Sequence, residues 1–433
     1  MKKLIVLLIC ALGLMVGCQS AETESTTQAD SQKPSKETSV EWNLDKITTA
    51  TINDFIYHII PSTDGSDAWI YKITPNEKTT SLNIPEIINN MKVTKLGYTF
   101  IPTKKDEIDD NEFNQTIFGE WVEYGHNSPG YGEAEQGIEQ VIIPDTVTEI
   151  ETACFSGMED LKEITIPSGV QKLQGETFYG CKNLEKIIIS EKLKAFELSD
   201  FSKCKKLKSI VVPKDSKTYY SENNCLIEKN KKKLVLAYGE EETLEIPNGV
   251  EILSREAFSS NYSKKIVIPA SVNKIEKYAF QRANGYSTDK IKDVIVDEKN
   301  KTFARDGQCI YNKKSKTLVV GINKNKNFIL SKKIEKLEDG YSIIGINTYE
   351  THFKKVVFPK SIYFGKDALS SFSLSCNFAD VYFYSDILPK ISSSSLFPTS
   401  CTIHVPKKAL GKYKSLYKKY GKLKYVDKWE TIL

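Results

Sequence analysis

An apolar strand pattern followed by a proline recurs every 23 residues in the middle of this chain. The repeated positions are Pro144, Pro167, Ser190 and Pro213 after the strands, and Phe155, Phe178 and Phe201 further along each copy. A unit this short cannot bury its own apolar face, so neighbouring copies must stack into one continuous core. The period therefore predicts a solenoid in which each repeat contributes one turn.

One copy of the repeat reads LxxIxIPxxVxxIxxxxFxxCxx, and its residue types indicate the course of one turn. The strand around Thr165 alternates between inward and outward side chains, and Pro167 ends it because proline lacks a backbone donor. We expect Val170 and Leu173 to point back into the stack, and Phe178 to fill a short convex turn. The prediction is a β-rich, right-handed solenoid of the α/β type with a parallel concave sheet.

The strand pattern can be followed well beyond the perfect copies. Twelve such strands, at roughly 4.8 Å each, predict a parallel sheet on the order of 50 Å long. Their cores are residues 82–84, 141–143, 164–166, 187–189, 210–212, 244–246, 266–268, 294–296, 328–330, 356–358, 381–383 and 403–405.

Two segments, near 214–240 and 298–325, interrupt this register and match each other at an offset of 84 residues. Lys217-Thr218-Tyr219 matches Lys301-Thr302-Phe303, and Cys225-Leu226 matches Cys309-Ile310. Each segment predicts an inserted hairpin on one edge of the solenoid. The turns are expected at 229–231 and 313–315.

The motif Ile-Pro-x-x-Val-x-x-Ile-x-x-x-x-Phe-x-x-Cys-x-x-Leu resembles the BspA-like, or treponemal-type, leucine-rich repeat family. The resemblance covers roughly residues 80–425 and rests on period, proline and phenylalanine together. It implies a leucine-rich repeat solenoid on a bacterial surface protein, often lipid- or wall-anchored and similar to adhesins. No motif of the family assigns a ligand to particular residues.

The first residues form a targeting segment rather than part of the fold. Lys2 and Lys3 precede an apolar stretch too short to span a membrane, and Met15-Val16-Gly17-Cys18 reads as a lipobox. Residues 1–17 thus resemble a lipoprotein signal peptide, which implies lipidation of Cys18 and an outward-facing anchor on the bacterial membrane. The alternative is ordinary secretion, with Cys18 unmodified. Residues 18–40 are polar and predict a disordered tether that begins at the lipidated cysteine.

The rest of the chain divides by its patterns into four parts. We expect an N-terminal cap with the first repeat over 41–100, an acidic aromatic insertion over 101–137, the repeats with their inserts over 138–406, and a C-terminal cap over 407–433. The insertion carries nine carboxylates and five aromatic rings that suit a ligand-contacting loop, an ion site or a variable insert. The C-terminal apolar residues are spaced as in a helix, which caps the stack or, with nine lysines nearby, contacts an anionic surface.

The middle residue of each strand is expected to face outward on the concave sheet. Most of these residues are apolar and have charged neighbours, a pattern typical of a protein-binding surface. The competing explanation is that β-branched residues simply suit a parallel sheet. The predicted ligand-binding stripe consists of Ile142, Thr165, Ile188, Val211, Glu245, Val267, Ile295, Ile329, Val357 and Tyr382.

The chain lacks sequence signs of catalysis, and we predict no enzyme activity, no metal and no cofactor. The histidines at 58, 126, 352 and 404 are scattered, and nucleophile, zinc-protease and nucleotide-binding motifs are missing from the sequence. The cysteines show no zinc-ligand spacing, and those in the repeats are expected to be free buried thiols. A formal charge of +4 is too small to indicate nucleic-acid binding.

These patterns favour a lipid-anchored adhesin or interaction protein that binds a host or microbial protein or glycan through the concave sheet. The alternative is a structural envelope protein that organises other surface components and has no host ligand.

Overall fold

The computed structural model divides into residues 1–40 and 41–433, and almost all of its described residues belong to the second unit. The predicted signal peptide, Cys18 and residues 19–39 of the tether lie outside the described residues, as does nearly all of the insertion over 101–137. The structure describes residues 40–76, 79–97, 115–116, 119–120, 137–281, 290–323, 326–344, 353–360, 362–365, 380–385, 387, 390–391, 402–417 and 422–426.

The described part of the chain begins with an antiparallel meander that leads into the repeats. Strands β1 (Thr48–Ile52), β2 (Phe55–Pro61) and β3 (Asp67–Pro75) pair in sequence order. Strand β6 (Met91–Leu96) then pairs parallel with β3, and β10 (Glu149–Ile150) pairs parallel with β6. The short strand β5 (Ile87–Ile88) also pairs with β6, whereas β7 (Gln115–Thr116) and β8 (Gly119–Glu120) form a separate pair. The meander therefore closes the first open turn of the stack.

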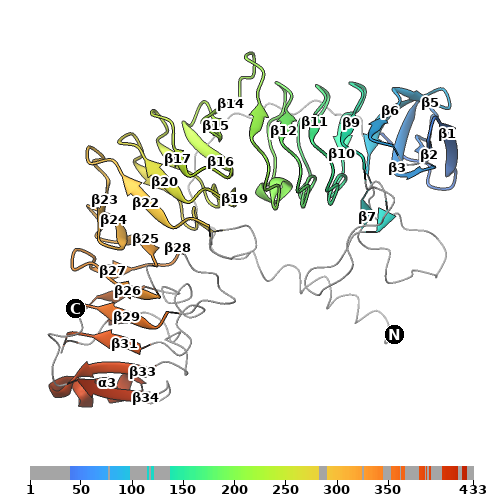
Figure 1. Cartoon of the computed structure of the whole chain (residues 1–433). Helices are drawn as coiled ribbons and strands as arrows, with labels where there is room; N and C mark the ends of the chain where they lie inside the picture. Colours follow the sequence, from blue (N-terminus) through green and yellow to red (C-terminus); the bar gives the residue numbers. More distant parts are fainter. Residues whose placement is uncertain are drawn as a thin grey trace, which may run out of the picture. The chain divides into compact units, whose positions relative to one another are not determined.

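The predicted parallel strands are present and form what we call the repeat sheet (Figure 1). All twelve predicted strand cores fall on its strands, and one further strand follows them. The prediction that these strands form one continuous sheet was wrong, however. They form three separate parallel sheets, and the name repeat sheet is used below for the three together. The first contains β4 (Ser81–Asn83), β9 (Gln140–Ile142), β11 (Glu163–Thr165), β12 (Lys186–Ile188) and β13 (Ser209–Val211). The second contains β17 (Thr243–Glu245), β20 (Lys265–Ile268) and β22 (Asp293–Val296). The third contains β26 (Asn327–Ile329), β29 (Lys355–Phe358), β31 (Asp380–Phe383), β33 (Thr402–Pro406) and β34 (Lys422–Val426).

The two inserts cause these breaks. Each contains the predicted hairpin with its turn where expected, preceded by a further antiparallel strand that the sequence did not predict. The third strand of the first insert then turns to pair parallel with the next repeat. The first insert consists of β14 (Tyr219–Glu222), β15 (Cys225–Glu228) and β16 (Lys233–Gly239), and the second of β23 (Phe303–Asp306), β24 (Cys309–Asn312) and β25 (Leu318–Ile322).

A side chain of each insert forms a hydrogen bond with a backbone group that the break in the repeat sheet leaves without a strand partner. At the first break, the backbone N–H of Ile210 donates to the Tyr238 hydroxyl at 3.3 Å. At the second, Arg305 Nη1 donates to the carbonyl oxygen of Val294 at 2.9 Å. Ile210 and Val294 are equivalent positions. Each insert therefore gives a hydrogen-bond partner to the last strand before the break, a tyrosine hydroxyl for an N–H in one case and an arginine for a C=O in the other.

A second, shorter ladder runs along the stack beside the repeat sheet. It comes from the Val-x-x-Ile part of each turn and is also interrupted at the inserts. Two further short strands, β19 (Ser260–Asn261) and β28 (Ser342–Ile344), pair parallel with β16 and β25. The strands of the second ladder are β10, β18 (Ile252–Leu253), β21 (Lys274–Ile275), β27 (Lys336–Leu337), β30 (Tyr363–Phe364) and β32 (Lys390–Ile391).

The repeat phenylalanines stack on one another in the core. The ring of Phe178 lies 5.9 Å from that of Phe155 and 6.2 Å from that of Phe201, and all three are buried. Beside them, the thiol of Cys204 donates to the carbonyl oxygen of Phe178 at 3.1 Å, one turn earlier. The hydroxyl of Ser260 makes the same contact with Phe201, so this side of the stack continues past the first insert.

Serine replaces the strand-ending proline at two positions, and it turns the chain by hydrogen bonding. Ser190 Oγ accepts from the N–H of Lys192 at 3.2 Å, and Ser331 Oγ accepts from the N–H of Lys333 at 3.0 Å. A serine that accepts from the backbone two residues on stabilises a turn without fixing the backbone covalently. The missing prolines therefore leave the repeat geometry unchanged.

The C-terminal cap contains the predicted helix, but the helix is followed by another strand. A 3₁₀ turn (Lys407–Ala409) leads into helix α3 (Leu410–Tyr417), which buries Tyr413. The Tyr413 hydroxyl donates to the carbonyl oxygen of Ser385 at 3.2 Å. Strand β34 then pairs parallel with β33. In the part of the chain that the structure describes, no helix has the length and apolarity needed to cross a membrane.

Candidate functional site

The predicted stripe forms three rows in register, one on each sheet of the repeat sheet. Within a row, neighbouring residues pair directly across adjacent parallel strands, as Ile188 does with Thr165 and Val211. The rows are Ile142, Thr165, Ile188 and Val211; then Glu245, Val267 and Ile295; then Ile329, Val357 and Tyr382. The inserts therefore divide the stripe.

Nine of the ten predicted stripe residues are exposed or half-buried, and three of the apolar ones are strongly exposed. Ile142 is 49% exposed, and Val211 and Ile295 are each 38% exposed. Val357 was predicted wrongly, because its side chain is fully buried. It lies in register between Ile329 and the large ring of Tyr382, and it is excluded from the stripe below.

Lysine–glutamate pairs between successive turns neutralise the edge of the stripe. Lys186 Nζ lies 2.8 Å from Glu163 Oε1, and Lys208 Nζ lies 3.1 Å from Glu185 Oε2. Similar pairs join Lys162 to Glu139 and Lys264 to Glu242, each at 2.7 Å. Because these four lysines each have a carboxylate partner, the charges that border the first row and the start of the second largely cancel.

His404 occupies the next position of the third row and was left out of the prediction, but its side chain is buried, so it supports the Tyr382 ring and adds no exposed stripe surface. It lies opposite Tyr382 in the ladder, and the two rings stack with centroids 4.3 Å apart and planes 9° apart. Its Nε2 is 2.7 Å from Asp380 Oδ1. The signal was present, since His404 holds the middle position of a predicted strand core, the position that defined the other members.

Asp200 and five cysteines are among the titratable groups buried in the described core. Asp200 is buried and accepts from the backbone N–H groups of Thr177 at 2.9 Å and Glu197 at 2.7 Å. Cys154, Cys181, Cys204, Cys225 and Cys309 are free and buried, as predicted. Cys376 and Cys401 lie outside the described residues. Over that same part of the chain, no group of three or more His, Cys, Asp or Glu residues is placed to hold a metal ion.

The sequence pattern and the paired parallel turns agree with one known family. The sequence model of the BspA type leucine-rich repeat region matches residues 133–237 and 235–320, with six copies in all. Residues 133–320 therefore carry repeats of the BspA type. BspA-type repeats form leucine-rich repeat scaffolds, which indicates a protein-interaction role and is typical of proteins without catalytic activity.

Several solved bacterial structures are similar to this BspA-type chain. The pneumococcal vaccine antigen PcpA is 14% identical, with a TM-score of 0.41 over 88% of this chain and 99% of that chain. A leucine-rich cell surface protein from Faecalibacterium prausnitzii is 18% identical, with a TM-score of 0.33 over 88% and 96%. A leucine-rich repeat protein from Bacteroides ovatus is 17% identical, with a TM-score of 0.32 over 89% and 99%. No curated protein matches the sequence significantly.

Proposed function

We propose that this BspA-type protein is a lipid-anchored adhesin or interaction protein of the bacterial surface. It binds a host or microbial protein or glycan through the stripe on its repeat sheet. The observation that carries the proposal is the exposed aliphatic side chains of the rows, above all Ile142 and Val211 in the first row and Ile295 in the second. Contiguous exposed apolar surface with a polar border is typical of protein-binding sites.

The charges beside the stripe support recognition by contact rather than by long-range attraction. Lysines such as Lys186 and Lys208 are already paired with carboxylates of the preceding turn. Exposed pairs of this kind contribute little stability and leave little net field to steer a charged partner. We therefore expect binding that depends on apolar contact and changes little with ionic strength.

The binding experiment uses the full-length chain as bait against host-surface and matrix extracts, with captured proteins identified by mass spectrometry. The variant Ile142→Lys, Val211→Lys, Ile295→Lys places a charge in two of the three rows and should lose the captured ligand. The control is Ile87→Lys, which changes an exposed isoleucine on β5, away from the stripe. Equal capture by the triple variant and the wild type would refute binding through the stripe.

The anchor is proposed from the lipobox, with acylation of Cys18 and an outward-facing protein at the end of a flexible tether. A surface location is also what the BspA-type resemblance implies. Cells that express the wild type and are fed an alkyne-labelled fatty acid should yield labelled protein in the membrane fraction. The variant Cys18→Ala should be unlabelled, whereas labelling of that variant would exclude Cys18 as the acylated residue.

A structural role in the envelope is the second candidate, since the same exposed rows can hold components of the same cell. Crosslinking on intact cells in the presence of host extract separates the two functions. Partners derived only from the bacterium itself favour the structural role, and host proteins favour the adhesin.

A further inference from the structure

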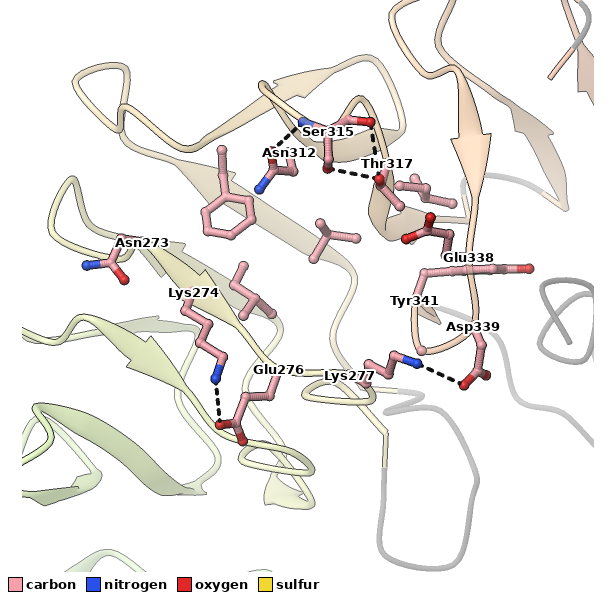
Figure 2. Close-up of a pocket in the computed structure, with 15 residues that line it drawn as sticks. Asn273, Lys274, Glu276, Lys277, Asn312, Ser315, Thr317, Glu338, Asp339 and Tyr341 are labelled. Atoms are coloured by element: carbon pink, nitrogen blue, oxygen red, sulfur yellow. Dashed lines mark hydrogen bonds and ion pairs between the residues drawn. The ribbon is translucent and has the colours of Figure 1, made fainter. Parts of the chain in front are cut away.

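Two grooves lie on the second ladder, one beside each insert. The groove at the second insert has a volume of about 250 Å³. Figure 2 shows Lys274 and Glu276 along one side of it, Thr317 of the insert across from them, and Glu338 on the following turn. The groove at the first insert has a volume of about 300 Å³.

The two grooves are built from equivalent residues. Phe303 and Val319 in the second groove correspond to Tyr219 and Val235 in the first, at the 84-residue offset of the inserts. Ile275 corresponds to Phe196, because each directly follows a residue whose N–H donates to the preceding turn, Lys274 to Glu251 O and Ala195 to Gln171 O. The grooves are therefore a consequence of inserting a meander into the stack, rather than an accident of one loop.

The edge of β21 that lines the second groove carries backbone groups without a hydrogen-bond partner among the described residues. The N–H of Lys274 donates to Glu251 O at 3.1 Å, and the N–H of Glu276 donates to Leu253 O at 2.9 Å, so both residues face β18. In a strand the residue between two such residues directs its backbone groups to the opposite edge. Ile275 therefore points its N–H and C=O away from β18, and no hydrogen bond joins them to another described residue.

The first groove has the same edge. The N–H of Ala195 donates to Gln171 O at 3.3 Å, and the carbonyl oxygen of Ala195 accepts from the N–H of Leu173 at 3.1 Å. Ala195 is thus paired with the preceding turn, and Phe196 faces the other way. Among the described residues its N–H and C=O likewise have no hydrogen-bond partner.

We propose that each groove binds an extended peptide segment of a partner protein as an added strand. The N–H of Ile275 or Phe196 donates to a peptide carbonyl, and the C=O of the same residue accepts from a peptide N–H. An apolar peptide side chain packs on the half-buried Ile275 and Val319, or on Phe196 and Val235. Strand addition to an exposed sheet edge is an established mode of peptide recognition.

The molecule itself shows which kind of segment suits this edge. On its other edge, β21 already pairs with β18, a two-residue extended segment of the preceding turn. The wall charges are already matched, since Lys277 Nζ lies 3.5 Å from Asp339 Oδ2 and Lys274 Nζ lies 3.6 Å from Glu276 Oε1. The volumes fall at or below the low end for drug-sized ligands, about 300 Å³. Backbone pairing is thus the main interaction that the grooves offer.

The test selects peptides from a random heptapeptide display library on the full-length chain and measures binding of the best peptide by calorimetry. The wild type should bind two peptides per chain. Ile275→Pro and Phe196→Pro should each bind one, and the double variant should bind at least tenfold more weakly overall. Proline at these positions removes an N–H that has no partner within the described fold, together with a half-buried side chain that packs on the core and would contact the peptide. Strand edges tolerate proline. Ile142→Lys on the stripe is the control and should bind two, which keeps this result independent of the function proposed above.

Amide hydrogen exchange tests the same contacts without substitution. The amides of Phe196 and Ile275 should exchange rapidly in the free chain and slow at least tenfold with saturating peptide. The amide of Lys274, which is paired with Glu251, should be protected in both states. The proposal is overturned if no peptide is enriched over the double proline variant, if selected peptides bind that variant equally, or if exchange at both amides is unchanged.

Discussion

Lys186 and Glu163 form an ion pair across one turn, with Nζ and Oε1 2.8 Å apart and the two residues separated by 23 positions in the sequence. The same separation joins Lys208 to Glu185. The repeat period is therefore present in the surface charges as well as in the core. A glutamate in one copy and a lysine at the same position of the next copy are thus placed to form such a pair.

The pair between Glu163 and Lys186 should contribute only modestly to stability. Both side chains are about two-fifths exposed, and exposed pairs couple by about 0.2–1 kcal/mol. A double-mutant cycle with Glu163→Ala and Lys186→Ala, followed by urea unfolding, should give a coupling energy in this range that shrinks in 1 M salt. A coupling above about 2 kcal/mol would show that the pair is stronger than its exposure implies.

The repeat sheet and its outward rows could be predicted because local residue patterns determine them. Alternation in segments such as Ile164-Thr165-Ile166 sets the faces of a strand, and a proline or serine directly afterwards sets its end. The insert hairpins were equally visible, since two copies at one offset align their turns.

The breaks in the repeat sheet, the burial of Val357 and the two grooves could not be predicted in this way. Tertiary contacts determine how the third strand of each insert pairs. Leu234, for example, pairs with Leu253 of a later turn. The turns also place non-glycine residues in the left-handed region two positions before the core phenylalanine. The residue types at these positions do not indicate this backbone conformation. These residues are Ala153, Glu176, Glu256 and Tyr278, with φ between 53° and 62°.

Replacing Phe178 should destabilise the stack strongly. Its ring lies buried between Phe155 and Phe201, and truncating a buried phenylalanine costs about 3–5 kcal/mol. The variant Phe178→Ala should lower the free energy of unfolding by this amount in urea titrations followed by circular dichroism. Tyr179→Ala, at the half-buried next position, is the control and should cost clearly less. Equal losses in both variants would contradict a special role of the phenylalanine stack.

The repeat cysteines should be inert in the folded protein. Burial raises the pKa of the Cys181, Cys225 and Cys309 thiols to about 12, and it raises those of Cys154 and Cys204 well above their usual range. Only the thiolate reacts readily with alkylating agents. Treatment with iodoacetamide at pH 8, followed by peptide mass spectrometry, should leave these five cysteines unmodified in the native chain and modify all five in 6 M guanidinium. Modification of any of them at the free-cysteine rate under native conditions would mean that its turn opens easily.

Asp200 should make the stability of the stack fall as the pH rises from about 4 to about 6. Desolvation raises the pKa of its buried carboxyl to about 6, although the N–H groups of Thr177 and Glu197 favour the charged form. Between the unfolded pKa, near 3.9, and the folded value, the folded state binds more protons than the unfolded state. Stability from this group is therefore complete below about pH 4 and is lost above about pH 6, a change of about 3 kcal/mol.

The variant Asp200→Asn isolates this contribution. Its side-chain oxygen can still accept from the N–H of Thr177, but its amide nitrogen faces the N–H of Glu197 and cannot accept. The variant should be less stable than the wild type by about 1–3 kcal/mol near pH 4, and the difference should narrow as the pH rises to 7. Urea unfolding at several pH values measures this directly, with Asp215→Asn at an exposed position as the control. Because every other titrating group is common to both chains, a difference that stays constant from pH 4 to pH 7 would show that Asp200 keeps an ordinary pKa in the folded protein.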